Sequence, residues 1–591
     1  MSEPKQIETK KAPISIALAA AAVLVIGGGI ISFWSIVQRR SAPDVPVGTE
    51  ILPQDALMAI SLTTDESQWR KLREFGTPES QALLDRYLLQ LRDRFLSVNG
   101  YNYQQDIQPW VGSEITVGFL PPFPVPIGND KTDSTPSAAR FSGQHSVVMV
   151  LPINNSLRAK QVLEKAQPPQ NGRWVNRTYK DVEIKQMQGV PEENQYAVTV
   201  LDGRYLVISN DSPTISRIID TYKGAPALAD MAGATKVWQR LEASRPFARL
   251  FINVPIAAAV ASLNSANPNP KKIATQQHNQ GFASTLTLES DGIGLDSMAW
   301  LKPDSELKYT VENNARTMAT RLPADTLMMI SGSNLQQLWS DYTAGVDANP
   351  ISPLDPQWLR RSIKSTTNLD LEKDLLSWMA GEFSFSIVPP VKGSNARYPI
   401  GVLFMVQASD RRAGEETLKK LDRAMSEEYN FTVEETQLAS QPVVQWTSPQ
   451  KSLSVTHGWL NGNVAFLSFL APVGEAIVPA PKQPLAMSEQ FQDIVPLELI
   501  PNNGHFFMDV ERAIQTETPS WIQLPSQQQI LIDAIQAIGV STAVESDRTT
   551  RYQVFVRLNK AGKPKPLPTP ASEDPQNSTP PSAPATPSDD S

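Results

Sequence analysis

Four histidines are the side chains best suited to metal binding or acid–base chemistry: His145, His278, His457 and His505. No two of them are spaced four residues apart, which would place two imidazoles on one helical face, and no His-Glu-x-x-His sequence occurs. The chain has no cysteine, which excludes disulfides, thiolate metal sites and iron–sulfur clusters. We therefore expect no metal site and no cofactor, and interpret the histidines as solvated or capping residues.

Two short sequences resemble catalytic motifs without their partners. Ser448-Pro449-Gln450-Lys451 matches Ser-x-x-Lys, but the Lys-Thr-Gly and Ser-Asp-Asn partners are absent and a proline interrupts the helix that the motif needs. Gly292-Ile293-Gly294 lacks the third glycine of a dinucleotide-binding loop. No Gly-x-Ser-x-Gly elbow occurs either. We predict that the chain is not an enzyme.

Two carboxylates stand at equivalent places in a repeated sequence, Glu114 after Trp110 and Glu382 after Trp378. If they converged on a shared cleft in different environments, they could act as general acid and general base. A structural role is the simpler interpretation, in which each glutamate caps a turn or pairs with an arginine. We interpret the two tryptophans as core anchors for the same reason: packing must persist in both copies of a duplicated unit.

The repeat extends well beyond these four residues. Residues 105–122 recur in outline as residues 373–390, at an offset of 268, and residues 52–61 recur as 322–331, at an offset of 270. Farther along, Val147 to Val150 matches Leu403 to Val406 at an offset of 256. A period of this length is the size of a whole domain. The sequence therefore predicts two tandem homologous domains.

The first 49 residues differ from the rest. Residues 14–37 form an uncharged apolar stretch of 24 residues, which as a helix would be about 36 Å long, enough to cross a membrane. A cleaved signal peptide is the alternative, although its apolar region is normally about 7–15 residues. We predict an uncleaved single-span anchor, with residues 1–13 in the cytoplasm, residues 38–49 as a stalk, and the bulk of the chain in the periplasm or a lumen.

The predicted boundaries divide the remainder into a first repeat unit at 50–303 and a second at 309–560. The last segment, 561–591, is rich in proline, serine and threonine, so we expect a disordered tail. The chain is 41% hydrophobic and 19% charged, which suits a globular protein. Its net charge of −8 argues against a nucleic-acid partner, which needs a basic surface.

Local patterns inside each unit indicate mixed secondary structure. Asp202-Gly203 and Asn461-Gly462 each separate two apolar runs, which predicts two hairpins because these residues accept positive φ. Strand-like alternation surrounds Val117, and residues 414–430 have helical spacing of apolar side chains. We expect the α+β class: a transmembrane helix followed by two α+β domains with mainly antiparallel sheets.

A family resemblance rests on the Leu-Pro-x-Asp-x-Leu sequences at 52–57 and 322–327, on the Trp-then-Glu entry to a strand, and on a single N-terminal span. In these features the chain resembles the cyanobacterial membrane-anchored family called domain of unknown function 3352, over residues 50–560. The family has no established activity to carry over. The resemblance implies a membrane-tethered, extracytoplasmic protein of a photosynthetic bacterium.

Three functions remain as hypotheses. The first is a non-enzymatic binding or scaffold module of the cell envelope or thylakoid, with a protein, glycan or lipid partner. The second is a carrier or chaperone for an apolar ligand such as lipid or pigment, suggested by Met149, Phe383, Phe385 and Met405 on predicted strands. The third is a hydrolase whose site carries no recognisable motif.

Overall fold

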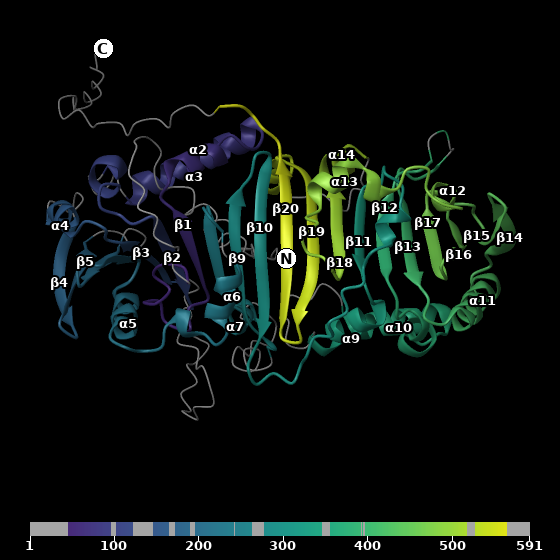
Figure 1. Ribbon diagram of the computed structural model, residues 1–591, viewed down its shortest axis with the longest axis horizontal. Helices are drawn as coiled ribbons and strands as arrows, with labels where there is room; N and C mark the ends of the chain where they lie inside the picture. The colour runs from purple at the N-terminus through teal and green to yellow at the C-terminus, as the bar shows by residue number, and fades with distance from the viewer. Residues whose placement is uncertain are drawn as a thin grey trace, which may run out of the picture.

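One antiparallel sheet of 20 strands runs the whole width of the molecule (Figure 1). This computed structural model describes residues 45–95, 102–121, 146–164, 172–189, 195–241, 243–262, 277–345, 355–391, 393, 396–516 and 526–563. The first half of the chain supplies the strands at the left of Figure 1, and the second half supplies those at the right. The two halves meet at the centre, where β10 lies beside β20.

The first repeat contributes ten strands, β1 to β10. They are β1 (Met58–Thr63), β2 (Glu114–Leu120), β3 (Ser146–Pro152), β4 (Arg173–Tyr179), β5 (Val182–Gln188), β6 (Ala197–Leu201), β7 (Tyr205–Ser209), β8 (Ala248–Asn253), β9 (Asn279–Leu288) and β10 (Gly292–Leu301). Its helical segments are α2 (Glu66–Leu72), α3 (Pro78–Phe95), η2 (Tyr103–Ile107), α4 (Ser156–Glu164), α5 (Ser212–Tyr222), η5 (Leu228–Asp230), α6 (Ala234–Arg240) and α7 (Val254–Ala261).

The second repeat contributes the other ten strands. They are β11 (Met328–Gly332), β12 (Phe383–Val388), β13 (Gly401–Gln407), β14 (Thr432–Leu438), β15 (Gln441–Thr447), β16 (Ser454–Leu460), β17 (Val464–Leu470), β18 (Gly504–Asp509), β19 (Ile535–Ser546) and β20 (Thr549–Leu558). Its helical segments are η7 (Met318–Thr320), α9 (Leu335–Gly345), α10 (Pro356–Thr367), η9 (Leu371–Leu375), η10 (Leu376–Trp378), α11 (Arg411–Glu427), α12 (Gly474–Ile477), η11 (Leu485–Met487), α13 (Glu489–Ile494), α14 (Val510–Gln515) and α15 (Ser526–Ile532).

Strand order is the same in the two repeats. From one edge to the centre it is β4-β5-β6-β7-β3-β2-β1-β8-β9-β10. From the other edge to the centre it is β14-β15-β16-β17-β13-β12-β11-β18-β19-β20. Each strand of the first repeat therefore has a counterpart ten places later in the numbering, and the two sets are joined through β10 and β20.

The expected fold class is wrong in its architecture. We expected two separate α+β domains, each with its own sheet, behind a transmembrane helix; instead all 20 strands form a single sheet. An unpaired β10 or β20 would expose a row of backbone donors and acceptors, and pairing the two strands removes both edges. Within the described part of the chain, no helix is long and apolar enough to cross a membrane. Residues 14–37 lie outside the described residues, as does the predicted tail beyond residue 563.

A pseudo-two-fold axis passes through the pair formed by Asp296 and Gln553. Thr285 is opposite Asp296 in the first repeat, and its counterpart Ser541 is opposite Gln553 in the second. Asp296 and Gln553 are thus counterparts of each other, and they are also direct partners across β10 and β20. The register of this pairing places the repeats symmetrically about one point in the sheet.

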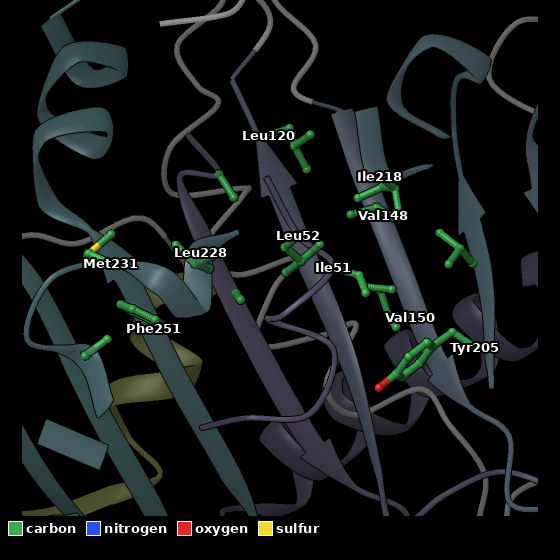
Figure 2. Close-up of a cluster of buried hydrophobic side chains, with 14 of the residues drawn as sticks. Ile51, Leu52, Leu120, Val148, Val150, Tyr205, Ile218, Leu228, Met231 and Phe251 are labelled. Carbon is green, nitrogen blue, oxygen red and sulfur yellow. The ribbon is translucent and has the colours of Figure 1, made fainter. Parts of the chain in front are cut away.

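The face of the sheet that carries Phe251 and Phe507, here called face A, is covered by helices in both repeats. Figure 2 shows the first-repeat core on this face, where Ile218 of α5 and Leu228 of η5 lie over Val148 and Phe251 of the strands. In the second repeat, Phe491 of α13 packs in the cluster that contains Phe507. Both clusters consist of fully or almost fully buried side chains, so face A supplies the main hydrophobic core.

The opposite face, here called face B, carries Ile60 in β1 and Ile330 in β11. Helix α2 covers part of it in the first repeat, where Trp69 is 3% exposed and packs with Ile60. At the outer strands α4 packs over the first repeat and α11 over the second. Cover on face B is therefore uneven along the sheet.

Ion pairs cross the junction between the repeats. Arg551 of β20 makes two hydrogen bonds with Asp296 of β10, from Nε to Oδ1 at 2.9 Å and from Nη2 to Oδ2 at 2.6 Å. Its Nη1 also donates to Glu545 at 3.2 Å, and Arg240 of α6 reaches the same carboxylate at 2.7 Å. The hydrogen bond with Asp296 raises the pKa of Arg551. These charges add directional contacts to the backbone pairing of β10 and β20.

We expect Arg551→Ala to lower the free energy of unfolding by about 1–3 kcal/mol, because it leaves the partly buried Asp296 without its cationic partner and removes one of the two arginines that bind Glu545. The measurement is equilibrium urea unfolding. The matched control is Arg412→Ala, whose side chain is 90% exposed and pairs with Glu416 on the surface of α11. Equal effects for the two variants would contradict a role for Arg551 in joining the repeats.

Candidate functional site

The repeated Asp-x-x-x-Trp sequences form the same local structure twice. In each copy a π-helical turn, η2 or η9, precedes the tryptophan. The indole Nε1 of Trp110 donates to the carbonyl of Asp106, and that of Trp378 donates to the carbonyl of Asp374 at 3.2 Å. The two tryptophans are 1% and 2% exposed and lie in apolar clusters on face B. Their surroundings leave no surface for a ligand.

Glu382 closes the turn at the start of η7. Its Oε1 accepts hydrogen bonds from the backbone N–H groups of Arg316, Thr317 and Met318 at 2.9, 2.8 and 3.0 Å. Its Oε2 accepts from the backbone and hydroxyl of Thr317. With both oxygens engaged and the residue 6% exposed, this carboxylate binds main chain rather than substrate.

Glu114 has a different environment although it occupies the equivalent position. Its Oε1 lies 3.6 Å from Nη2 of Arg249, and its Oε2 is buried with no hydrogen-bond partner. Burial raises the pKa of Glu114, and the nearby Arg249 opposes that shift. The side chains of the pair are 13% and 7% exposed, so the site is a buried ion pair.

The two glutamates do not share a cleft. Eight strands lie between β2, which begins at Glu114, and β12, which Glu382 immediately precedes. At about 4.8 Å per strand this is a separation of roughly 40 Å. The two carboxylates are therefore too far apart to act on one substrate as general acid and general base.

The histidines in the described part of the chain are separated from one another. His278 contacts Ser305, and His505 Nδ1 lies 3.0 Å from the hydroxyl of Ser541. His457 Nε2 lies 2.7 Å from Asp422, and its Nδ1 is buried without a partner. His145 lies outside the described residues. Each imidazole thus belongs to a different local structure.

The Ser-x-x-Lys sequence forms the turn between β15 and β16. The hydroxyl oxygen of Ser448 accepts from the backbone N–H groups of Ser452 and Leu453 at 3.0 and 2.9 Å. Lys451 has a φ of 53°, in the left-handed region. The segment is a hairpin turn rather than the start of a helix, so this serine has a structural role.

The clearest candidate for a binding site is on face B, where apolar side chains form two parallel rows across six adjacent strands. We call this set the open apolar surface. Each row follows direct cross-strand partners through β12, β11, β18, β19, β20 and β10. The rows are Phe385, Ile330, Phe506, Val540, Val554 and Leu295, and Ile387, Met328, Met508, Ile538, Val556 and Ile293. All twelve side chains are partly or largely exposed.

Comparison with the first repeat shows that the exposure of β11 and β12 on face B is greater than that of their counterparts β1 and β2. Ile330 is 41% exposed, while its counterpart Ile60 is 8% exposed. Phe385 is 39% exposed, while its counterpart Val117 is 2% exposed. On face B, β1 and β2 are therefore closed over, while β11 and β12 are open.

One substitution and one changed side-chain contact between the repeats accompany the difference in cover. In the first repeat, the ring of Trp69 packs edge-on against Phe247 at 4.7 Å, and both lie over the sheet. The counterpart of Trp69 is Trp339 of α9, whose indole donates to Glu372 instead. The counterpart of Phe247 is Asn503, a polar residue. The aromatic pair that closes face B in the first repeat is thus absent from the second.

The composition of the open apolar surface decides what it can do. Its side chains are aliphatic, aromatic or thioether groups, so it supplies no acid, base, nucleophile or metal ligand. Such a surface binds apolar groups through burial, at about 25 cal/mol for each Å² removed from water. The backbone beneath it is hydrogen-bonded on both sides, which leaves no free strand edge there for an added peptide strand.

Of the four residues that suggested an apolar ligand in the sequence, only Phe385 is among the twelve. Phe383 is 6% exposed under the helices of the second repeat, and Met405 is fully buried on face A. Met149 lies on face B of the first repeat and is partly buried. The strand alternation predicts which residues share a face, but not whether a helix covers that face.

The family model for protein of unknown function (DUF3352) matches residues 17–558. The chain belongs to this family. A comparison with curated protein sequences finds no match. Among solved structures, the one titled "Structure of crystal form III of TP0453" aligns over 43% of this chain and 80% of that chain, at 8% identity and a TM-score of 0.21. A likeness at this TM-score carries no argument about fold or function.

His505 provides a pH-dependent measure of packing beneath the open apolar surface, on face A of β18. Burial lowers the pKa of His505 to about 4, below its unfolded value of about 6.5. Its contribution to stability is therefore present above pH 6.5 and is lost as the pH falls toward 4. We expect the loss between pH 7 and pH 4.5 to be about 2–3 kcal/mol smaller in His505→Gln than in the unmodified chain.

Urea unfolding at the two pH values measures this difference. The control is Ser331→Ala, which removes the hydroxyl that bonds the backbone of His505 but keeps the imidazole. The control should retain the pH dependence of the unmodified chain. An unchanged pH dependence in His505→Gln would contradict the assignment.

Proposed function

We propose that this member of the DUF3352 family is a non-enzymatic binding module, and that the open apolar surface binds the acyl chain of a lipid. The observation that carries the proposal is the exposure of Ile330 and Phe385 at positions that the first repeat buries. A scaffold for a protein or glycan partner is the broader form of this function. A surface without charged groups favours the apolar ligand.

The dimensions of the surface support an acyl chain as the occupant. The two rows cross six strands, a width of about 24 Å at about 4.8 Å per strand. A hydrocarbon core of about 30 Å is two acyl chains thick, so one chain extends about 15 Å. One acyl chain along the rows would therefore contact several strands at once, and each fully buried side chain would contribute about 1.5–3 kcal/mol.

The first repeat offers a natural control for this binding. Val540 and Val554, adjacent in one row, have Ser284 and Ser297 as counterparts, and those serine hydroxyls lie 2.8 Å apart. The double variant Val540→Ser, Val554→Ser would introduce the same pair of mutually hydrogen-bonded hydroxyls into the second repeat. We expect it to weaken binding of pyrene-labelled palmitate about tenfold, because it removes apolar contact from the middle of the row.

Fluorescence titration of the full-length chain measures the affinity, and circular dichroism checks that the fold is retained. The reciprocal variant Ser284→Val, Ser297→Val changes the first repeat only and should leave the affinity unchanged. Equal affinities for the unmodified chain and the Val540→Ser, Val554→Ser variant would contradict acyl binding on this surface. Acyl binding could then be rejected while a protein or glycan partner stayed open to pull-down tests.

We also propose that the chain is held at a membrane by residues 14–37, with its sheet outside the cytoplasm. The support is the uncharged length of that segment. Leu24→Arg with Ile26→Arg places two charges at its centre, at a cost of about 2.5–3.5 kcal/mol each for insertion. We expect the unmodified chain to stay with membranes on alkaline carbonate extraction and the double variant to be released. Release of the unmodified chain would contradict the anchor.

A further inference from the structure

Helix α10 of the second repeat carries an exposed aromatic residue among basic ones. Its sequence from Pro356 to Thr367 holds three cationic residues and no acidic one. Trp358, in its first turn, is 55% exposed. Arg361 follows one helical turn later on the same side, and its side chain is 76% exposed. Helix α10 therefore combines an exposed aromatic ring with exposed cationic groups and has no acidic residue of its own.

The cations of α10 fall into two groups. Arg360 is built into the fold: its Nε donates to Glu372 at 2.6 Å, and its guanidinium lies over the ring of Trp339. Arg361 has only a loose contact of 4.0 Å with Asp355, between two exposed side chains. Lys364 is also exposed, and its Nζ donates to the carbonyl of Asn368 at the end of the helix. Arg361 and Lys364 can therefore meet anions from outside the protein.

The neighbouring helix α9 adds a second exposed apolar side chain. Its Leu338 is 53% exposed, one residue before the Trp339 that links α9 to Arg360 of α10. Its first residue, Leu335, packs in the cluster that includes Phe383 and Phe404 of face B. Figure 1 shows α9 and α10 next to each other at the end of the second-repeat strands. The two helices are thus held side by side, and α9 reaches β12 through the contact of Leu335 with the cluster of Phe383.

We propose that α9 and α10 are a membrane-surface contact, with Trp358 and Leu338 entering the interfacial region of a bilayer and Arg361 and Lys364 contacting anionic headgroups. The charge of α10 complements a lipid phosphate, and an amphipathic ring with a polar N–H is suited to the headgroup level. Cationic amphipathic helices with tryptophan bind bilayer surfaces in this way. In the first repeat, α3 also begins with proline, but its third residue is Ser80, which is 9% exposed, where α10 has Trp358.

The absence of cysteine allows a site-specific test in the full-length chain. The variant Trp358→Cys is labelled with the fluorophore NBD and mixed with phosphatidylcholine vesicles, with or without phosphatidylglycerol. We expect NBD emission to rise with the mixed vesicles and to be quenched by lipids that carry a spin label in the headgroup-proximal region. The matched control is Leu157→Cys on α4, which is 76% exposed in the first repeat and should not respond. A local label reports α10 whatever residues 14–37 do.

The charges are tested by adding Arg361→Gln and Lys364→Gln to the labelled chain. We expect vesicle affinity to fall about 25-fold, because each basic residue near an anionic surface contributes about fivefold. Arg360→Gln tests a cation that the fold already holds, and it should change affinity much less. Equal responses at positions 358 and 157, or equal affinity for vesicles with and without phosphatidylglycerol, would overturn the proposal. So would a rise in emission with protein concentration alone, which would indicate a second copy as the occupant.

The result is independent of the palmitate titration. Loss of vesicle binding with retained palmitate binding would reject the membrane contact and leave the proposed ligand intact. Loss of palmitate binding with a retained vesicle response would do the reverse. None of the twelve residues of the open apolar surface belongs to the proposed membrane contact, so each experiment tests a different set of side chains.

Discussion

The antiparallel pairing of β10 with β20 is the interaction on which the architecture depends. Each repeat ends its chain of strand neighbours at one of these two strands, so without the pairing both would be edges. Nine residue pairs join them, centred on Asp296 and Gln553. A sheet edge pairs readily with any extended partner, and a duplicated unit brings a partner of identical geometry on the same chain. The continuity of the sheet therefore follows from the pairing of the two end strands.

This pairing also fixes where the two repeats are free to differ. Face A must be covered in both, because its large side chains, among them Phe251 and Phe507, are fully buried in the core. Hydroxyl groups on that face bond the covering segments in both copies, Thr285 to the carbonyl of Leu241 and Ser541 to that of Pro496. Face B carries no such requirement at the centre of the sheet. The differences that open the apolar surface are all on face B, where a change costs no core packing.

Sequence reasoning found the repeat but not the way its copies meet. Period-two alternation and the residues at Asp202-Gly203 and Asn461-Gly462 indicate local strands and hairpins, and hairpins lie at both places. Matching by residue type alone gave Val150 the counterpart Val406, whereas the register gives Met405, which faces Ser384 as Val150 faces Thr116. A one-residue shift costs little in composition but reverses the face. The pairing of β10 with β20 could not be predicted from local patterns, because the sequence of each is that of an ordinary strand.

The candidate site was harder to predict than the fold, because it exists only where no helix covers the apolar face of the sheet. Ile330 and Ile60 are the same residue type at equivalent positions of equivalent strands, yet their exposures are 41% and 8%. The difference arises at a distance in sequence, where Trp339 hydrogen-bonds Glu372 and Asn503 replaces a phenylalanine. Those two positions become informative only after the repeats are aligned and the cross-strand register is known. In a duplicated protein, comparison with the buried copy thus identifies which apolar side chains of the other copy are exposed at positions that the fold can bury.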